Sequence, residues 1–214
     1  MKKLFVFLLL CLCYCLSFGL SVEAKNIKFI QVTDIHMTQN NVEALQKFVD
    51  DINGNYSNLD FIIFTGDNID KANANDLNLF LDTIKKIHIK KYVLMGNHDL
   101  MKNQDMSKEY YMKTVKKKLG IYHSGKPNYV FKDGKIVFLV MNGVKEVIPS
   151  PNGYFRKSEL DWMDKKLTKY KNHKVVIVQH FPLFETRVKG HELYKQNEYM
   201  DVLNKHNNVI AIIS

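Results

Sequence analysis

The chain has 214 residues, of which 46% are hydrophobic and 25% are charged, and its formal net charge is +9. This composition suits one domain with a substantial core and excludes an intrinsically disordered chain. The basic residues are almost all lysines scattered over predicted helix surfaces, so we expect no dedicated nucleic-acid surface, although the diffuse positive field favours the approach of phosphorylated substrates.

Residues 1–24 have the layout of a secretory signal peptide. Two lysines precede an apolar run from Leu4 to Leu20, and Ala24 is a small residue suited to stand before a cut. We therefore expect a mature domain over 25–214 that is exported to the periplasm, the cell envelope or the extracellular space. An uncleaved membrane anchor is the alternative, because the apolar run is nearly long enough to span a bilayer. Only in that case do we expect contact with a membrane.

All the cysteines of the chain lie inside this leader, at Cys11, Cys13 and Cys15. None follows the small residue that a lipoprotein cut requires, so the sequence gives little support to a lipid anchor. The mature domain is expected to lack disulfides, and any metal that it holds must use nitrogen and oxygen ligands.

From residue 25 onward the chain alternates short β-rich runs with longer amphipathic ones. Strands are predicted at 27–33, 61–65 and 91–95, and helices at 42–51, 76–87 and 105–119. The first of these helices has apolar residues at helical spacing, such as Val42, Leu45 and Val49, and Gly120 is suited to end the last one.

The pattern changes in the second half of the chain. Two strands joined by a turn that contains Asp133 and Gly134 are expected to form a hairpin. Ser158 fits a capping box that opens a helix running to about Tyr170. The strands of this half are predicted at 128–131, 136–141, 175–178 and 209–213. Alternating strands and helices followed by antiparallel pieces indicate an α/β domain with mixed sheets.

Four of the predicted strands end in side chains that bind metal ions, within the segments TDIH, TGDNID, GNHD and VQHFP. In open α/β sheets ligands bind outside the carboxyl ends of the strands, so these side chains are expected to converge on one crevice. A helix cap would explain one such carboxylate, but not four strand ends together. Asp34 and His36 are two apart on a chain expected to be extended, so both should point to the same side. The candidates are Asp34, His36, Asp67, Asp70, Asn97, His98 and His180.

This set offers carboxylate, amide and imidazole ligands without thiolate, which suits manganese, iron, zinc or cobalt. Two divalent ions are expected, because one carboxylate can bridge a pair. Two ions about 3.5–4 Å apart are the arrangement that stabilises in-line displacement at phosphorus.

These segments together resemble the calcineurin-like metallophosphoesterases. The likeness is carried by Asp34-x-His36, Gly66-Asp67-x-x-Asp70, Gly96-Asn97-His98-Asp99 and His180-x-Pro182, and it extends from Ile27 to the last residue. The resemblance implies a four-layer α/β/β/α sandwich with two mixed β-sheets.

The resemblance also implies a set of metal ligands. Asp34 and His36 would bind one ion, and Asp67 would bridge the two. Asn97 and His180 would hold the second ion.

The same resemblance implies the catalytic residues. His98 would contact the phosphate or protonate the leaving oxygen, and the carboxylate of Asp70 would orient it. The implied reaction is hydrolysis of a phosphodiester or phosphomonoester by a metal-bridging hydroxide.

Two departures from the family pattern modify these expectations. The purple acid phosphatase branch has tyrosine at the place of Asp70, which disfavours that branch. The family's last block, Gly-His-x-His, is expected after the strand at 209–213 and is not found. Gly190-His191 is no substitute, because residue 193 is leucine and no strand leads into it. Each ion would keep three protein ligands, counting Asp67 twice, so we expect a truncated member with weakened metal affinity and low or absent turnover.

The alternative function is a degenerate, non-catalytic domain of the same fold that binds a metal or ligand. The substrate could be a cyclic nucleotide, a nucleotide monoester, a phospholipid or a cell-envelope diester. Its specificity is expected to reside in the loops 100–127 and 143–157. Among the remaining histidines, His123 is a candidate for the rim of the site, and the others, His191 included, are interpreted as residues without a role there.

Overall fold

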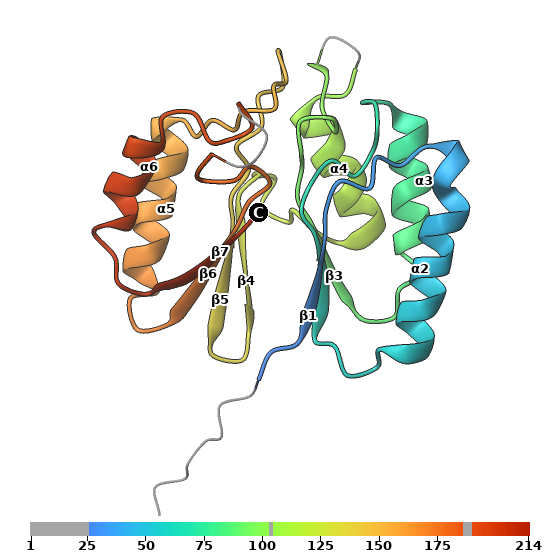
Figure 1. Ribbon diagram of the computed structural model, residues 1–214, viewed down its shortest axis with the longest axis horizontal. Coiled ribbons are helices and arrows are strands. Elements are labelled where there is room, and N and C mark those ends of the chain that lie inside the picture. The colour runs from blue at the N-terminus through green and yellow to red at the C-terminus, as the bar shows by residue number, and fades with distance from the viewer. Residues whose placement is uncertain (1–25, 103–104, 186–189) are drawn as a thin grey trace, which may run out of the picture.

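A computed structural model of the chain describes residues 26–102, 105–185 and 190–214 (Figure 1). The first sheet consists of β1 (Phe29–Val32), β2 (Phe61–Phe64) and β3 (Lys90–Val93), in that order. The second consists of β4 (Tyr129–Asp133), β5 (Ile136–Val140), β6 (Lys174–Val178) and β7 (Val209–Ile213), also in chain order. The strands of the first sheet pair in parallel, whereas the second sheet is mixed, because its β4–β5 hairpin is antiparallel.

The helices lie on the outer faces of the two sheets (Figure 1). The helical segments are η1 (Gln39–Asn41), α2 (Val42–Asn55), α3 (Ala74–Ile84), α4 (Lys108–Leu119), α5 (Lys157–Lys169) and α6 (Gln196–Leu203). Helices α2, α3 and α4 cover the first sheet, and α5 and α6 cover the second. The four-layer α/β/β/α sandwich expected from the sequence is therefore confirmed.

Alternating side chains of the strands supply the core on both faces of each sheet. In β2, Ile62 and Phe64 pack toward the helices, whereas Phe61 and Ile63 pack between the sheets. Because successive residues of a strand point to opposite faces, a strand buried on both sides must be apolar throughout. All four residues of β2 are buried, which explains the uninterrupted sequence FIIF.

Several helix ends differ from the expectation: α2 runs on to Asn55 instead of residue 51, α3 spans Ala74–Ile84 instead of 76–87, and α4 begins at Lys108 instead of residue 105. The helix α5 begins at Lys157, with Arg156 rather than Ser158 at the N-cap, and the Glu159 carboxylate accepts a hydrogen bond from the Arg156 N–H at 2.8 Å. The predicted capping box at Ser158 is thus wrong by two residues, although Glu159 acts as a cap. Gly120 ends α4 with φ 69°, as predicted, because this left-handed conformation favours glycine.

Helix α6 was not predicted from the sequence. It has eight residues, of which only Tyr199 and Val202 are buried, and its N-cap, Lys195, makes no side-chain capping hydrogen bond. So short an apolar pattern gives little periodic signal.

The leader expected at 1–24 lies outside the described residues. Within the described ranges, no helix is both long enough and apolar enough to cross a membrane.

Candidate metal centre

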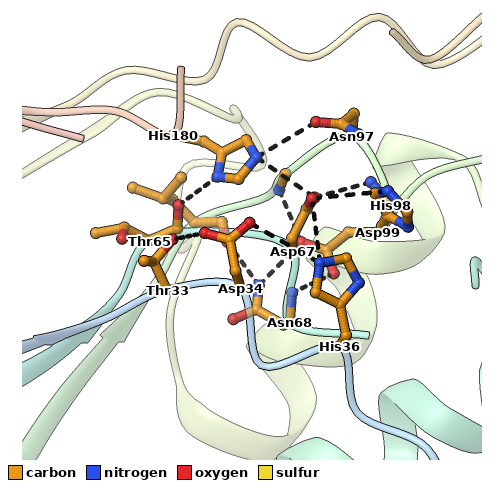
Figure 2. Close-up of polar contacts among 12 residues, drawn as sticks. Thr33, Asp34, His36, Thr65, Asp67, Asn68, Asn97, His98, Asp99 and His180 are labelled. Carbon is orange, nitrogen blue, oxygen red and sulfur yellow. Dashed lines mark hydrogen bonds and ion pairs between the residues drawn. The ribbon is translucent and has the colours of Figure 1, made fainter. Parts of the chain in front are cut away.

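The carboxyl ends of β1, β2, β3 and β6 open into one cavity of about 420 Å³. Its lining includes most of the side chains predicted from the sequence, and Figure 2 shows them grouped around Asp67. The predicted residues that line it are Asp34, His36, Asp67, Asn97, His98 and His180. Asp70 is not part of this lining, but it contacts both His36 and His98.

Backbone hydrogen bonds fasten the loop after β1 to the loop after β2. The N–H of Asp34 donates to the Gly66 carbonyl at 3.1 Å, and the N–H of His36 donates to the Asp67 carbonyl at 3.0 Å. Asp34, His36 and Asp67 have positive φ values of 54°, 48° and 49°. Such left-handed backbone is costly for residues other than glycine, and it persists where the surroundings over-determine it.

These dihedrals correct one expectation from the sequence. Asp34 and His36 do not lie on an extended segment, because β1 ends at Val32 and both residues are left-handed. They nevertheless approach each other, with His36 Nε2 3.9 Å from an Asp34 carboxylate oxygen. The kinked loop, rather than strand alternation, brings the two side chains together.

Asp67 lies at the centre of the group, with 4% of its surface exposed. Its Oδ1 accepts a hydrogen bond from the His98 N–H at 2.8 Å and lies 3.4 Å from His180 Nε2. Its Oδ2 lies 3.9 Å from His36 Nε2. Burial by itself raises the pKa of Asp67, but the hydrogen bond and charge of His180, together with His98, outweigh burial and lower the pKa below its usual value. The buried carboxylate is therefore kept ionised.

His180 is the residue that the second sheet contributes to this group. Its Nδ1 lies 2.9 Å from the Thr65 carbonyl, an acceptor, so Nδ1 carries the proton. Nε2 then faces two oxygens, Asn97 Oδ1 at 3.3 Å and Asp67 Oδ1 at 3.4 Å. Burial lowers the pKa of His180, but its hydrogen bond to Asp67 and the charge of Asp67 outweigh burial and raise it. A lone pair that meets two acceptor oxygens needs a cation or a proton between them.

His98 and Asp70 are arranged differently from the expectation. His98 Nδ1 lies 2.7 Å from the Asp70 backbone carbonyl, whereas the Asp70 carboxylate lies 3.5 Å from His36 Nδ1. The carbonyl, rather than the carboxylate, is thus placed to orient His98. The rings of His36 and His98 meet edge to face, with centroids 4.5 Å apart.

Asp99 supports the site through hydrogen bonds to the loops after β2 and β3, and it was not identified as a site residue from the sequence. Its side chain is fully buried, and its two oxygens accept hydrogen bonds from the backbone N–H groups of Asn68, Ile69 and Gly96 and from the Asn68 amide, at 2.7–3.0 Å. Burial and the charge of Asp67 raise the pKa of Asp99 to about 7, while the Gly96 and Ile69 donors oppose that rise. Asp99 therefore ties the loops after β2 and β3 together. The pattern Gly-Asn-His-Asp contains it, but only the tertiary contacts give it this role.

The donor groups fit divalent cations. Two sets of three side chains have ligand atoms within 4.8 Å of one another, and both sets contain Asp67. One set adds His36 and His98, and the other adds Asp34 and His180. The resemblance had implied Asp34 with His36 and Asn97 with His180, so the grouping differs while Asp67 stays shared. Ionised oxygen and imidazole donors around a buried carboxylate suit borderline metal ions.

Further residues line the cavity beside the predicted ones. Pro151, Phe181, Pro182 and His191 belong to its wall. His191, interpreted from the sequence as a residue without a role at the site, thus lies in the cavity wall, although it is not in either donor set. It follows no strand, so the pattern that found the other candidates could not find it.

His123 does not reach the rim of this cavity. It lines a separate hollow of about 490 Å³ that has no described lining residue in common with the metal centre.

Comparison with known proteins agrees with this geometry. The family model described as calcineurin-like phosphoesterase matches residues 27–214. A "Probable glycerophosphodiester phosphodiesterase" of Arcobacter nitrofigilis is 24% identical over 196 residues, which cover 86% of this chain and 68% of the relative. A "Probable cyclic nucleotide phosphodiesterase" of Colwellia psychrerythraea is 27% identical, over 90% of this chain and 71% of the relative.

A solved structure from Thermus thermophilus shares the fold, with a TM-score of 0.57 and 14% identity over 87% of this chain and 81% of that one. The fold, the convergence of the predicted ligands and the family match lead to one conclusion: this chain is a hydrolytic enzyme of the calcineurin-like phosphoesterase family.

Proposed function

We propose that the protein hydrolyses phosphodiesters with the help of two divalent cations. The observation that carries this proposal is the pair of donor sets that share the buried, ionised Asp67 at one cavity. A single structural ion would not require a second set around the same carboxylate.

Each side chain has a part in this proposal. Asp34, His36, Asp67, Asn97 and His180 hold the cations. When bound, the cations neutralise charge that develops on the phosphoryl oxygens and lower the pKa of water. Manganese, iron, zinc and cobalt all suit these donors.

His98 belongs to one donor set, but in this proposal it is the proton donor to the leaving oxygen, which leaves Asp67 and His36 of that set to hold the ion. Its Nε2 points toward the Asp67 carboxylate at 4.0 Å, and its Nδ1 is held by the Asp70 carbonyl at 2.7 Å. Because a carbonyl accepts only, Nδ1 keeps its proton and Nε2 is the atom that exchanges one. A general acid fixed in this way gives a proton to the departing alkoxide.

The shape of the site favours a diester over a monoester. A second hollow of about 490 Å³ adjoins the metal-centre cavity, and Asn97, His98 and Pro151 line both. Phosphorus in a diester carries two organic substituents, and two hollows that meet at the metal centre offer a place for each. Lys71 and Met101 lie in the second hollow. Both relatives described above are named as probable phosphodiesterases, which supports the same substrate class.

The test is hydrolysis of bis-p-nitrophenyl phosphate and of p-nitrophenyl phosphate by the protein with each of the four metals. Each donor set has three side chains, so free metal is kept in excess during the assay. Because each donor set has only three side chains, we expect slow, metal-dependent turnover that is faster on the diester. His98→Asn should lower kcat on the diester by about a hundredfold, the usual scale for a lost general acid, whereas the exposed His88→Asn should not.

The alternative of a non-catalytic binding domain predicts a different result. In that case the protein binds metal, as measured by mass spectrometry after dialysis, but hydrolyses neither ester with any of the four metals. Faster turnover of the monoester would instead contradict the assignment to diesters.

A further inference from the structure

A third hollow, at the open edge of the sandwich and separate from the two hollows described above, differs in chemistry from the metal centre. It lies where β3 and β4, the edge strands of the two sheets, come together beside α5. We call it the edge groove and define it by Tyr92, Tyr129, Phe131, Trp162, Lys126 and Lys166. Its volume of about 490 Å³ is in the usual range for small-molecule sites.

Aromatic rings form the floor of the edge groove. Tyr92 stacks on Phe131 with ring centroids 3.6 Å apart, and Phe131 stacks on Phe138 of the core between the sheets at 4.7 Å. This stack of rings therefore runs from the core to the groove. The hydroxyl of Tyr129 donates a hydrogen bond to the Val93 carbonyl at 2.9 Å. Because the hydroxyl has this partner, Tyr129 contributes its ring to the lining of the groove.

The charged groups that line the edge groove are basic. Lys126, Lys166 and His123 line it, and no acidic side chain is among its described lining residues. Lys166 lies one helical turn after Trp162 on α5, with its Nζ 5.4 Å from the centre of the indole ring. This cation–π contact holds the ammonium over the aromatic wall instead of leaving it free in solvent.

From this juxtaposition of stacked rings and lysines we propose that the edge groove binds a nucleoside monophosphate. Any planar nucleobase can stack on aromatic side chains, and lysine ammonium groups pair with phosphate. The base lies against the aromatic wall, and the phosphate lies between Lys126 and Lys166. The groove has no described lining residue in common with the metal centre, so this site stands apart from the proposed hydrolysis.

The chain offers a direct probe of this site, because Trp162 is its only tryptophan. Titration of the protein with AMP, in the presence of a chelator that keeps metal from the other cavity, should quench Trp162 fluorescence to saturation. Lys166→Ala should weaken AMP binding about tenfold, which is the loss of one charge-assisted hydrogen bond. Lys165→Ala is the matched control, because Lys165 is exposed on the same helix and does not line the groove, and it should leave the affinity unchanged.

Four results would overturn the proposal. The first is that AMP causes no saturable quenching, and the second is that an acidic peptide quenches Trp162 where AMP does not. The third is that ribose 5-phosphate binds as tightly as AMP, which would show phosphate attraction without stacking. The fourth is that the two lysine variants bind AMP equally well. Because binding is read without metal, and Lys166→Ala should leave diester hydrolysis unchanged, failure here is distinct from failure of the proposed hydrolysis.

Discussion

The two sheets contribute to the metal centre in very different ways. Loops after β1, β2 and β3 supply six of the seven predicted residues and are tied to one another by backbone hydrogen bonds, by Asp99 and by the His98 N–H. Of these seven, the second sheet supplies only His180, which reaches across to the Thr65 carbonyl and to Asp67. The loops after β1, β2 and β3 thus form one hydrogen-bonded unit, which we call the cradle. The second sheet completes the site with the imidazole of His180. We therefore expect changes in the cradle to alter both folding and metal binding, and changes at His180 to act chiefly on metal binding, with the loss of one hydrogen bond to the Thr65 carbonyl.

The largest effect is expected for Asp67→Asn. The amide can still accept a hydrogen bond from the His98 N–H but carries no charge for the cations, so diester hydrolysis should fall by more than about a hundredfold, the upper end of the loss for residues that only support a metal ligand. Steady-state kinetics with excess manganese measures this. Asp201→Asn, an exposed change on α6, is the control. A variant that keeps more than a tenth of the activity would show that Asp67 is not the shared ligand.

His180→Ala isolates the part played by the second sheet. The set of Asp34, Asp67 and His180 loses a member while Asp67 and His36 stay in place, so the metal content should fall from two ions to one per chain and activity should fall by about a hundredfold. Metal analysis by mass spectrometry reads the stoichiometry, and His88→Asn serves as the control. Unchanged stoichiometry would mean that the first sheet holds both ions without help.

Asp99→Asn tests the cradle through stability. The new amide nitrogen must face either the Asn68 and Ile69 N–H groups or the Gly96 N–H and Asn68 amide, so buried donors meet a donor. We expect a loss of about 2–4 kcal/mol in the free energy of unfolding, measured by urea denaturation. Asp201→Asn should change this quantity by less than about 0.5 kcal/mol. Equal stability of the two variants would show that Asp99 does not hold the loops after β2 and β3 together.

The smallest effect compares two glycines. A Cβ at Gly96 would clash with the Asp67 backbone nitrogen, whereas a Cβ at Gly54, within α2, would meet nothing within 4 Å. Gly54→Ala should therefore raise the free energy of unfolding by about 0.5–1 kcal/mol, because alanine loses less conformational freedom in a helix. Thermal unfolding followed by circular dichroism measures it. Gly96→Ala should be destabilising, and the opposite ranking would show that the cradle has room to relax.

Most strands and helices, and most side chains of the candidate site, can be predicted from local sequence patterns. Runs such as FIIF and helical spacing such as Val42, Leu45 and Val49 predict strands and helices, because burial on one or two faces imposes a period on the chain. Metal-binding residue types after successive strands were enough to name the side chains that gather around Asp67, since parallel strands end at one edge of a sheet.

What only the tertiary structure decided are the contacts between loops that lie far apart in the chain. Asp34 and His36 have left-handed backbone where the loop after β1 is hydrogen-bonded to the loop after β2, and no local sequence pattern predicts this conformation. Asp99 becomes a tie because four donors from two loops surround it, and His191 joins the cavity wall although no strand leads to it. Periodicity records which face of an element is buried, but it carries no information about which partner lies across the gap.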